Sequence, residues 1–305
     1  MSTAVTSAPA EKMKIQSSKP SFFGMLGGEL FKISHQWITW IMLVLIACII
    51  ALPYIITLTV PDVKDTINHT PLIFLANRMT QNLAVLRVFI GIFLLVITAC
   101  VIGLEYQLGT IRVLLSRGVG RLQLLTAKLT AIVIIGLVVF VVAILYNVLL
   151  MSGLLLIMVG NLNAYNAITP DFWTQAQQYV LTVLTSMGVT ILLAAAASVV
   201  GRSLTFGLSI ALAWFPVDNI GTIFLILANR LTHSDFWLNV SAYLLGPNLN
   251  IMPKALITAK TEIFTIGAQP YVTVDGAHTL WVTLVYALIF AAVAMVLTWR
   301  RDVKE

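Results

Sequence analysis

Long apolar runs separated by short polar segments make up most of the chain. The first run, Trp37 to Val60, has 24 residues. At about 1.5 Å per residue it would span ~36 Å, more than the ~30 Å hydrocarbon core of a bilayer. Six such runs predict an all-α integral membrane protein whose spans lie at about 37–60, 83–103, 124–150, 175–200, 204–228 and 279–299.

The third run is the least clearly bounded, because its apolar character continues from Leu124 to Gly160. Dividing it into two spans would leave Leu149–Gly160, which at twelve residues is too short to cross a bilayer. We therefore expect one span here and an even number of spans in total.

Two segments outside the spans have helical patterns. Ser21–His35 places an apolar residue every three or four positions, which predicts an amphipathic helix in the inner interface over 21–36; the alternative is a disordered tail. Residues 1–20 are expected to form a disordered cytoplasmic tail, and 37–301 the six-span domain. In the outer loop, "SDFWLNVSAYLLGP" predicts a short helix that starts at Ser234 or Asp235 and ends at Gly246–Pro247.

Composition agrees with a membrane protein. Hydrophobic residues make up 59% of the chain and charged residues 10%, against roughly 45–50% and about 25% in soluble domains. The net charge of +6 does not indicate nucleic acid binding, since no basic stripe alternates with exposed aromatic residues.

Basic residues also predict the orientation. With the N-terminus inside, twelve Lys and Arg fall on the inner side, and five fall outside: Lys64, Arg78, Arg230, Lys254 and Lys260. Because basic residues favour the cytoplasmic side, both termini and the segment between spans 2 and 3 are predicted to be cytoplasmic.

That segment, "GLEYQLGTIRVLLSRGVGRLQLLTAKL" (103–129), is longer than a simple connector. Leu108, Ile111 and Leu115 are spaced to form one helix face over Glu105–Ser116, and Gly118 and Gly120 should end that helix. Such a helix could dock into another protein or rest on anionic lipid, and the residues alone favour neither.

The same stretch resembles the signature of type-2 ABC transporter permeases. In that family an acidic residue ends span 2, a "GT-I/L-R-x-L-L-S-R-x-x-x-R" run follows, and a basic residue lies early in span 3. Gly118 departs from this pattern, since the family often has proline there, but both residues break a helix. The matching positions are Glu105, Gly109, Thr110, Arg112, Ser116, Arg117, Arg121 and Lys128.

The resemblance implies a coupling helix that fits a cleft on a cytoplasmic ATPase subunit. The sequence contains no G-x-x-x-x-G-K-[ST] phosphate loop, so ATP and magnesium would bind a separate ATPase chain, and this chain would have no catalytic site or cofactor. A second permease chain, identical or related, and membrane lipid are the other expected partners, in a prokaryotic inner or plasma membrane. The expected ATPase contacts are Glu105, Leu108, Gly109, Thr110, Ile111, Arg112, Leu115, Ser116 and Arg117.

The expected function is export of an amphipathic or lipid-like substrate, because the spans contain few polar residues. A passive channel or a non-transporting membrane scaffold is the alternative, although no polar filter sequence is present. An intramembrane enzyme is disfavoured, since no span carries two acids or a Ser/His couple at helical spacing.

Two ionisable residues fall within predicted spans. Arg87 and Asp218 lie about 24 Å and about 21 Å from the inner ends of spans 2 and 5. At such similar depths they could form an intramembrane ion pair, with Pro216 bending span 5 beside it. The alternative is that both side chains reach the outer interface or water.

Overall fold

The computed structural model describes residues 21–116, 118–257 and 263–300, and all the regular structure in those ranges is helical. As predicted, six helices within these ranges are long and apolar enough to cross a membrane. They are α2 (Trp37–Thr59), α4 (Pro71–Thr98) with its continuation η1 (Ala99–Gly103) and α5 (Leu104–Gln107), α7 (Arg121–Met158), α8 (Pro170–Gly201), α9 (Leu204–Thr232) and α12 (Gly276–Arg300). The shorter helices are α1 (Phe22–Ser34), α3 (Val63–His69), α6 (Thr110–Ser116), η2 (Asn163–Ala167), α10 (Phe236–Ser241) and α11 (Leu245–Leu256).

Spans 2 and 3 are longer than their apolar runs. They are continuous over Pro71–Gln107 and Arg121–Met158, 37 and 38 residues, or about 55 Å each. Hydropathy marks only the residues suited to hydrocarbon, whereas a helix continues wherever its polar side chains find partners. In the first turns of α4, Arg78 donates a 2.9 Å hydrogen bond to Gln81. Span 3 is undivided, as expected.

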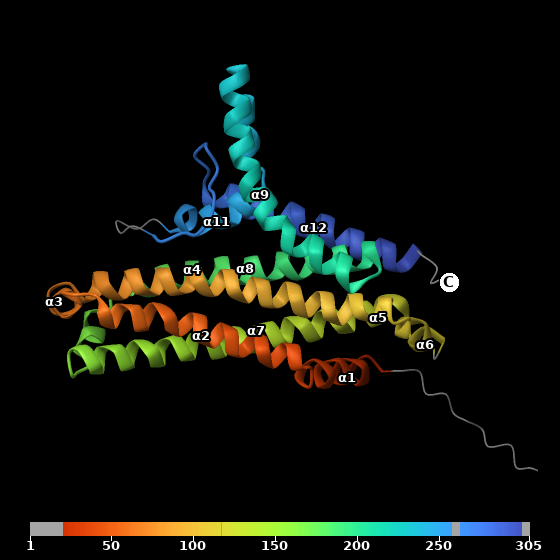
Figure 1. The fold of residues 1–305 in the computed structure, drawn as a ribbon, viewed down its shortest axis with the longest axis horizontal. Coiled ribbons are helices and arrows are strands. Elements are labelled where there is room, and N and C mark those ends of the chain that lie inside the picture. Colours follow the sequence, from red (N-terminus) through yellow and green to blue (C-terminus); the bar gives the residue numbers. More distant parts are fainter. Residues whose placement is uncertain (1–20, 117, 258–262, 301–305) are drawn as a thin grey trace, which may run out of the picture.

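Helices α4 and α8 form the interior of the bundle. In their most apolar windows 67% and 72% of residues are buried, against 11% in α9. Helix α8 packs against α4, α9 and α12, while α2 and α7 pack against α4. Figure 1 shows α2 and α7 on one side of the central pair and α12 on the other.

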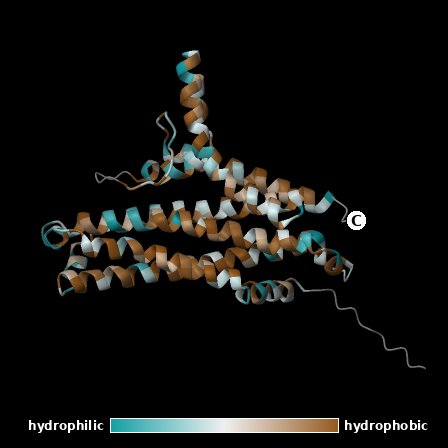
Figure 2. Ribbon diagram, in the orientation of Figure 1, coloured by the Kyte–Doolittle hydropathy of each residue, from teal (hydrophilic) through white to brown (hydrophobic). Residues whose placement is uncertain are grey.

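Helix α9 leaves the bundle partway along its length. Its first half packs on α8 and η1, but Figure 1 shows its second half standing away from the other spans. Pro216 lies within α9, where a missing N–H and a crowded ring bend a helix, as the sequence predicts. We call 217–231 the α9 arm; Figure 2 shows it to be largely apolar. Its exposed apolar residues are Val217, Ile220, Ile223, Phe224, Leu227 and Leu231.

The loop between α9 and α12 differs from the prediction. The predicted helix begins at Phe236, with Asp235 at its N-cap, but it ends at Ser241. Gly246 and Pro247 do not end a helix: they lie in the first turn of α11, which begins at Leu245. The first four N–H groups of a helix have no intrahelical partner, so a proline costs little there.

Helix α1 is present where the apolar spacing predicts a helix. Its N-cap Ser21 accepts a 3.1 Å hydrogen bond from the Gly24 amide. The helix packs against α7, and Ile33, on the predicted stripe, is fully buried. Residues 1–20, predicted to be a tail, lie outside the described ranges.

Candidate functional site

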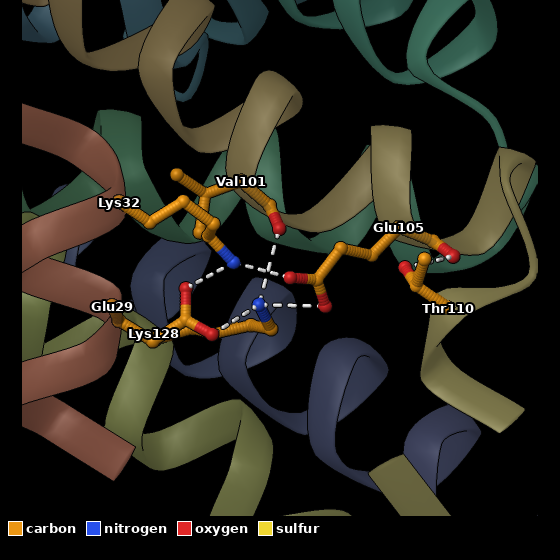
Figure 3. Close-up of polar contacts among 6 residues, drawn as sticks. All are labelled: Glu29, Lys32, Val101, Glu105, Thr110 and Lys128. Atoms are coloured by element: carbon orange, nitrogen blue, oxygen red, sulfur yellow. Dashed lines mark hydrogen bonds and ion pairs between the residues drawn. The ribbon is translucent and has the colours of Figure 1, made fainter. Parts of the chain in front are cut away.

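Four charged side chains from three separate segments meet at one end of the bundle (Figure 3). Glu29 and Lys32 come from α1, Glu105 from α5 and Lys128 from α7. Lys128 Nζ lies 2.8 Å from Glu29 Oε1 and 2.8 Å from Glu105 Oε2. Lys32 Nζ lies 2.7 Å from Glu29 Oε2 and donates a hydrogen bond to Glu105 Oε1. We call these four residues the charge cluster.

The charge cluster is balanced and largely buried. Lys128 is 2% exposed and Glu29 7%. Burial lowers the pKa of Lys32, but the hydrogen bonds and charges of Glu105 and Glu29 outweigh it, so the net pKa lies above its ordinary value. Removing one member of such a group leaves a buried charge without its partner, a loss of about 3–5 kcal/mol.

Lys128 also contacts the backbone of span 2. Its Nζ donates a 3.3 Å hydrogen bond to the Val101 carbonyl, which lies in the π-turn η1. A π-turn widens the helix and changes the pairing of its carbonyls. On the opposite side, a Cβ on Gly103 would lie 2.8 Å from Leu204 Cα, so only glycine allows η1 to touch the start of α9 this closely. The Leu204 amide donates to Gln107 Oε1 at 3.2 Å.

Helix α6 follows directly from this anchored segment. The predicted single helix over Glu105–Ser116 is wrong, since the chain breaks at Gly109, whose φ of 70° is in the left-handed region that favours glycine. The Gly109 amide bonds to the Tyr106 carbonyl at 3.2 Å and closes the turn. Gly118, with φ of 84°, separates α6 from α7, as predicted.

The break at Gly109 splits the face that the spacing predicts. Ile111 is 7% exposed and packs within this chain, and Leu115 is half-buried. Leu108 and Val113 are instead 65% and 52% exposed. The remaining predicted contacts lie as follows: Thr110, Arg112 and Ser116 are exposed, Gly109 and Glu105 are half-buried, and Arg117 lies outside the described residues.

A cleft of about 250 Å³ lies between α6 and the ends of α7, α8 and α12. Arginines from three segments line it: Arg112 from α6, Arg121 from α7 and Arg202 from the end of α8. Arg121 donates a 3.4 Å hydrogen bond to the Trp299 carbonyl of α12. Helix α6 therefore packs on the bundle through Ile111 and has a basic cleft beside it.

A family described as "ABC-2 family transporter protein" matches residues 26–303, nearly the whole chain. The chain belongs to the ABC-2 transporter family. It is thus a multi-pass membrane permease subunit of an ABC transporter, a family that in general works with an ATP-binding cassette partner. No curated protein and no solved structure matches it.

The ABC-2 permease does not pair Arg87 with Asp218, so that prediction is wrong. Arg87 donates 2.9 Å hydrogen bonds to the Leu249 carbonyl and to Asn250 Oδ1. Pro253 has no N–H to give to the Leu249 carbonyl four residues earlier, so Arg87 supplies the missing donor. Asp218 accepts a 2.7 Å hydrogen bond from the Gly246 amide, where a carboxylate is favoured by the N-terminal partial charge of α11. Both side chains hold α11 rather than each other.

Sequence reasoning missed the role of Glu29 and Lys32 in this permease. The predicted helix over 21–36 includes both residues, but its apolar spacing assigns neither of them a partner. The available signal was that Glu105 and Lys128 are charged residues at the inner ends of two apolar spans, where each needs a partner. A glutamate and a lysine three positions apart on the neighbouring helix could have been matched to them.

Removing the Lys128 charge tests whether the charge cluster holds these helices together. We expect Lys128→Met to destabilise the purified permease by about 3–5 kcal/mol, because Glu29 and Glu105 lose a buried partner. Thermal unfolding followed by tryptophan fluorescence would show a lowered Tm. Lys64→Met removes an exposed lysine and is the matched control. Equal Tm values for the two variants would show that the cluster contributes no net stability.

Proposed function

We propose that this ABC-2 permease exports an amphipathic or lipid-like substrate, driven by a separate ATPase subunit that binds α6 as the coupling helix. The observation that supports this most strongly is the charge cluster. It joins the segment that carries α6 to α1 and α7, so that a force applied at α6 reaches several spans together.

The proposed orientation places α1, α6 and the end of α12 in or near the cytoplasm. These three elements lie at the same end of the bundle in Figure 1, and α3 lies at the other. The predicted inner segments carry twelve Lys and Arg against five in the outer ones, the bias typical of cytoplasmic sides. In this orientation α1 lies at the inner interface, where its exposed Phe23 and Phe31 suit contact with lipid.

A force on α6 would reach the spans because the helix that leads into α6 is continuous with α4. Helix α5 continues α4 through the π-turn without a break, so a pull on α6 acts first on the central span α4. Glu105 then carries the same displacement to Lys128 of α7 and Lys32 of α1. Because the 305-residue sequence contains no phosphate-loop motif, this proposal assigns ATP binding and hydrolysis to the partner chain.

The exposed apolar residues of α6 and of its preceding turn are the best test of docking. We expect Leu108→Asp and Val113→Asp to reduce co-purification of the co-expressed ATPase at least tenfold, since both place a charge in the proposed apolar contact. Ile111→Asp is unsuitable, because Ile111 is buried in this chain.

Leu162→Asp changes an exposed leucine at the other end of span 3 and is the control. The docking assignment is wrong if the α6-end variants retain as much ATPase as this control does. Loss of ATPase in all three variants would point to a general folding defect and would also count against a specific contact.

A second permease chain is the other proposed partner, and the α9 arm is where we expect it to pack. The arm is apolar, stands away from its own bundle and follows the bend at Pro216. A helix that leaves its own bundle can bury its sides against a second copy or a related chain.

Photo-crosslinking in native membranes would test this contact. A photoreactive residue at Phe224, 64% exposed, should give a product with the mass of two permease chains. The same residue at Val148 of α7, 54% exposed, should react with lipid and give no such product. A two-chain product of equal yield at both positions, or at neither, would contradict packing through the arm.

A further inference from the structure

A cavity of about 320 Å³ lies among α4, α8, α9 and α11, next to Arg87. Its volume is within the ~300–1,000 Å³ typical of small-molecule sites. Most of its wall is apolar, including Val88, Ile92, Leu212 and Phe215. The polar residues that line it are Arg87, Ser186, Thr190, Asn219 and Asn250.

Arg87 lines this cavity as a buried cation whose partners are all neutral. It is 6% exposed, and it donates to the Leu249 and Ile266 carbonyls and to Asn250 Oδ1. None of the ion pairs formed among the described residues includes Arg87. Its buried Nε has no hydrogen-bond partner within that part of the chain. A buried charge with neither a counter-charge nor a full set of hydrogen bonds is costly.

The surrounding structure fixes the guanidinium in place. Asn250, which accepts from Arg87, also donates to Asn219 Oδ1 at 3.0 Å and to the Ala268 carbonyl at 2.8 Å. Gly267 allows the loop to approach, since a Cβ there would lie 2.3 Å from Asn250 Nδ2. The cation is thus held by groups that orient it without neutralising it.

Gly91 shows that the space beside Arg87 is open. It lies one turn further along α4, lines the cavity and is buried, yet an added Cβ would meet no atom within 4 Å. Across the cavity, Phe215 and Pro216 lie at the bend of α9. A movement of α9 would therefore change the shape of the cavity.

We propose that this cavity binds the anionic head group of an amphiphile, with the acid group against Arg87 and the apolar portion along α4 and α9. The inference rests on the proposed transport function and narrows the substrate class to amphiphiles with a phosphate, carboxylate or sulfate group. Guanidinium binds such groups through charge-assisted hydrogen bonds, and Arg87 has both the charge and, among the described residues, a donor without a partner.

Binding to the purified permease in phosphatidylcholine nanodiscs tests the proposal without the ATPase. The probes are dodecyl phosphate and dodecylphosphocholine, which share a chain but differ in net charge. We expect dodecyl phosphate to bind at least about tenfold more tightly. Arg87→Gln should abolish that preference while still donating hydrogen bonds, and Arg87→Lys should retain part of it.

Filling the cavity provides an independent variant that keeps the arginine. Gly91→Phe should abolish dodecyl phosphate binding, whereas Gly153→Phe on α7, where an added Cβ also meets no atom within 4 Å, should bind as the unaltered chain does. Thermal unfolding of each variant identifies any that fail to fold. Unchanged dodecyl phosphate binding in folded Arg87→Gln and Gly91→Phe, or equal affinity for the two probes, would overturn the proposal.

A second measurement tells whether the anionic group belongs to a transported amphiphile or to a resident lipid. If dodecyl phosphate stimulates ATP hydrolysis by the assembled transporter, the cavity takes a transported amphiphile. If an anionic phospholipid co-purifies with the permease, is lost in Arg87→Gln and gives no stimulation, the cavity holds a resident lipid. Failure of the ATPase to assemble would bear on the proposed function and leave the binding result intact.

Discussion

The charge cluster is the constraint on which one end of this permease depends. Glu29 and Lys32 of α1, Glu105 of α5 and Lys128 of α7 come from three segments that are far apart in sequence, and each charge would be costly to bury alone. Together they satisfy one another only if α1, α5 and α7 keep their relative positions. Two backbone features accompany this arrangement. The π-turn presents the Val101 carbonyl to Lys128, and Gly103 allows η1 to pack closely against α9.

Helix α4 connects the charge cluster with the cavity. Arg87 lies on α4 and Glu105 on its continuation, eighteen residues apart, or about 27 Å along a helix. One end of this span holds α1 and α7 through ion pairs, and its middle holds α11 through the hydrogen bond from Arg87 to the Leu249 carbonyl. In the proposed cycle, a displacement of α6 would move α4, and α4 would carry this movement to the proposed anion-binding cavity.

Hydropathy was sufficient to predict the six spans and the helical class, because a bilayer requires long apolar helices. The pattern of glycines also predicted the separation of α6 from α7 at Gly118. It could not predict that Gly109 breaks the segment, since a glycine within an apolar spacing is equally compatible with a continuous helix.

The contacts of the charged residues within the spans could not be predicted from the sequence either. Similar depth made an ion pair between Arg87 and Asp218 one of two alternatives, but depth does not tell which faces of two helices meet. The short helix α11 occupies the space between them and uses both. Gly246–Pro247 resemble a helix end in sequence and were predicted to be one, whereas they lie in the first turn of α11.

If the charge cluster joins α6 to α1, as we propose, the two helices move as one unit. Spin labels at Leu114 of α6, half-buried and outside the proposed ATPase contact, and at exposed Phe31 of α1 can report this in the assembled transporter once Cys48 and Cys100 are replaced by serine. Pulsed electron–electron double resonance should give the same distance distribution without nucleotide and with bound ATP. In Lys128→Met the distribution should be broader and should change with nucleotide. A distance that changes with ATP while the cluster is intact would show that α6 moves independently of α1, and would contradict the account.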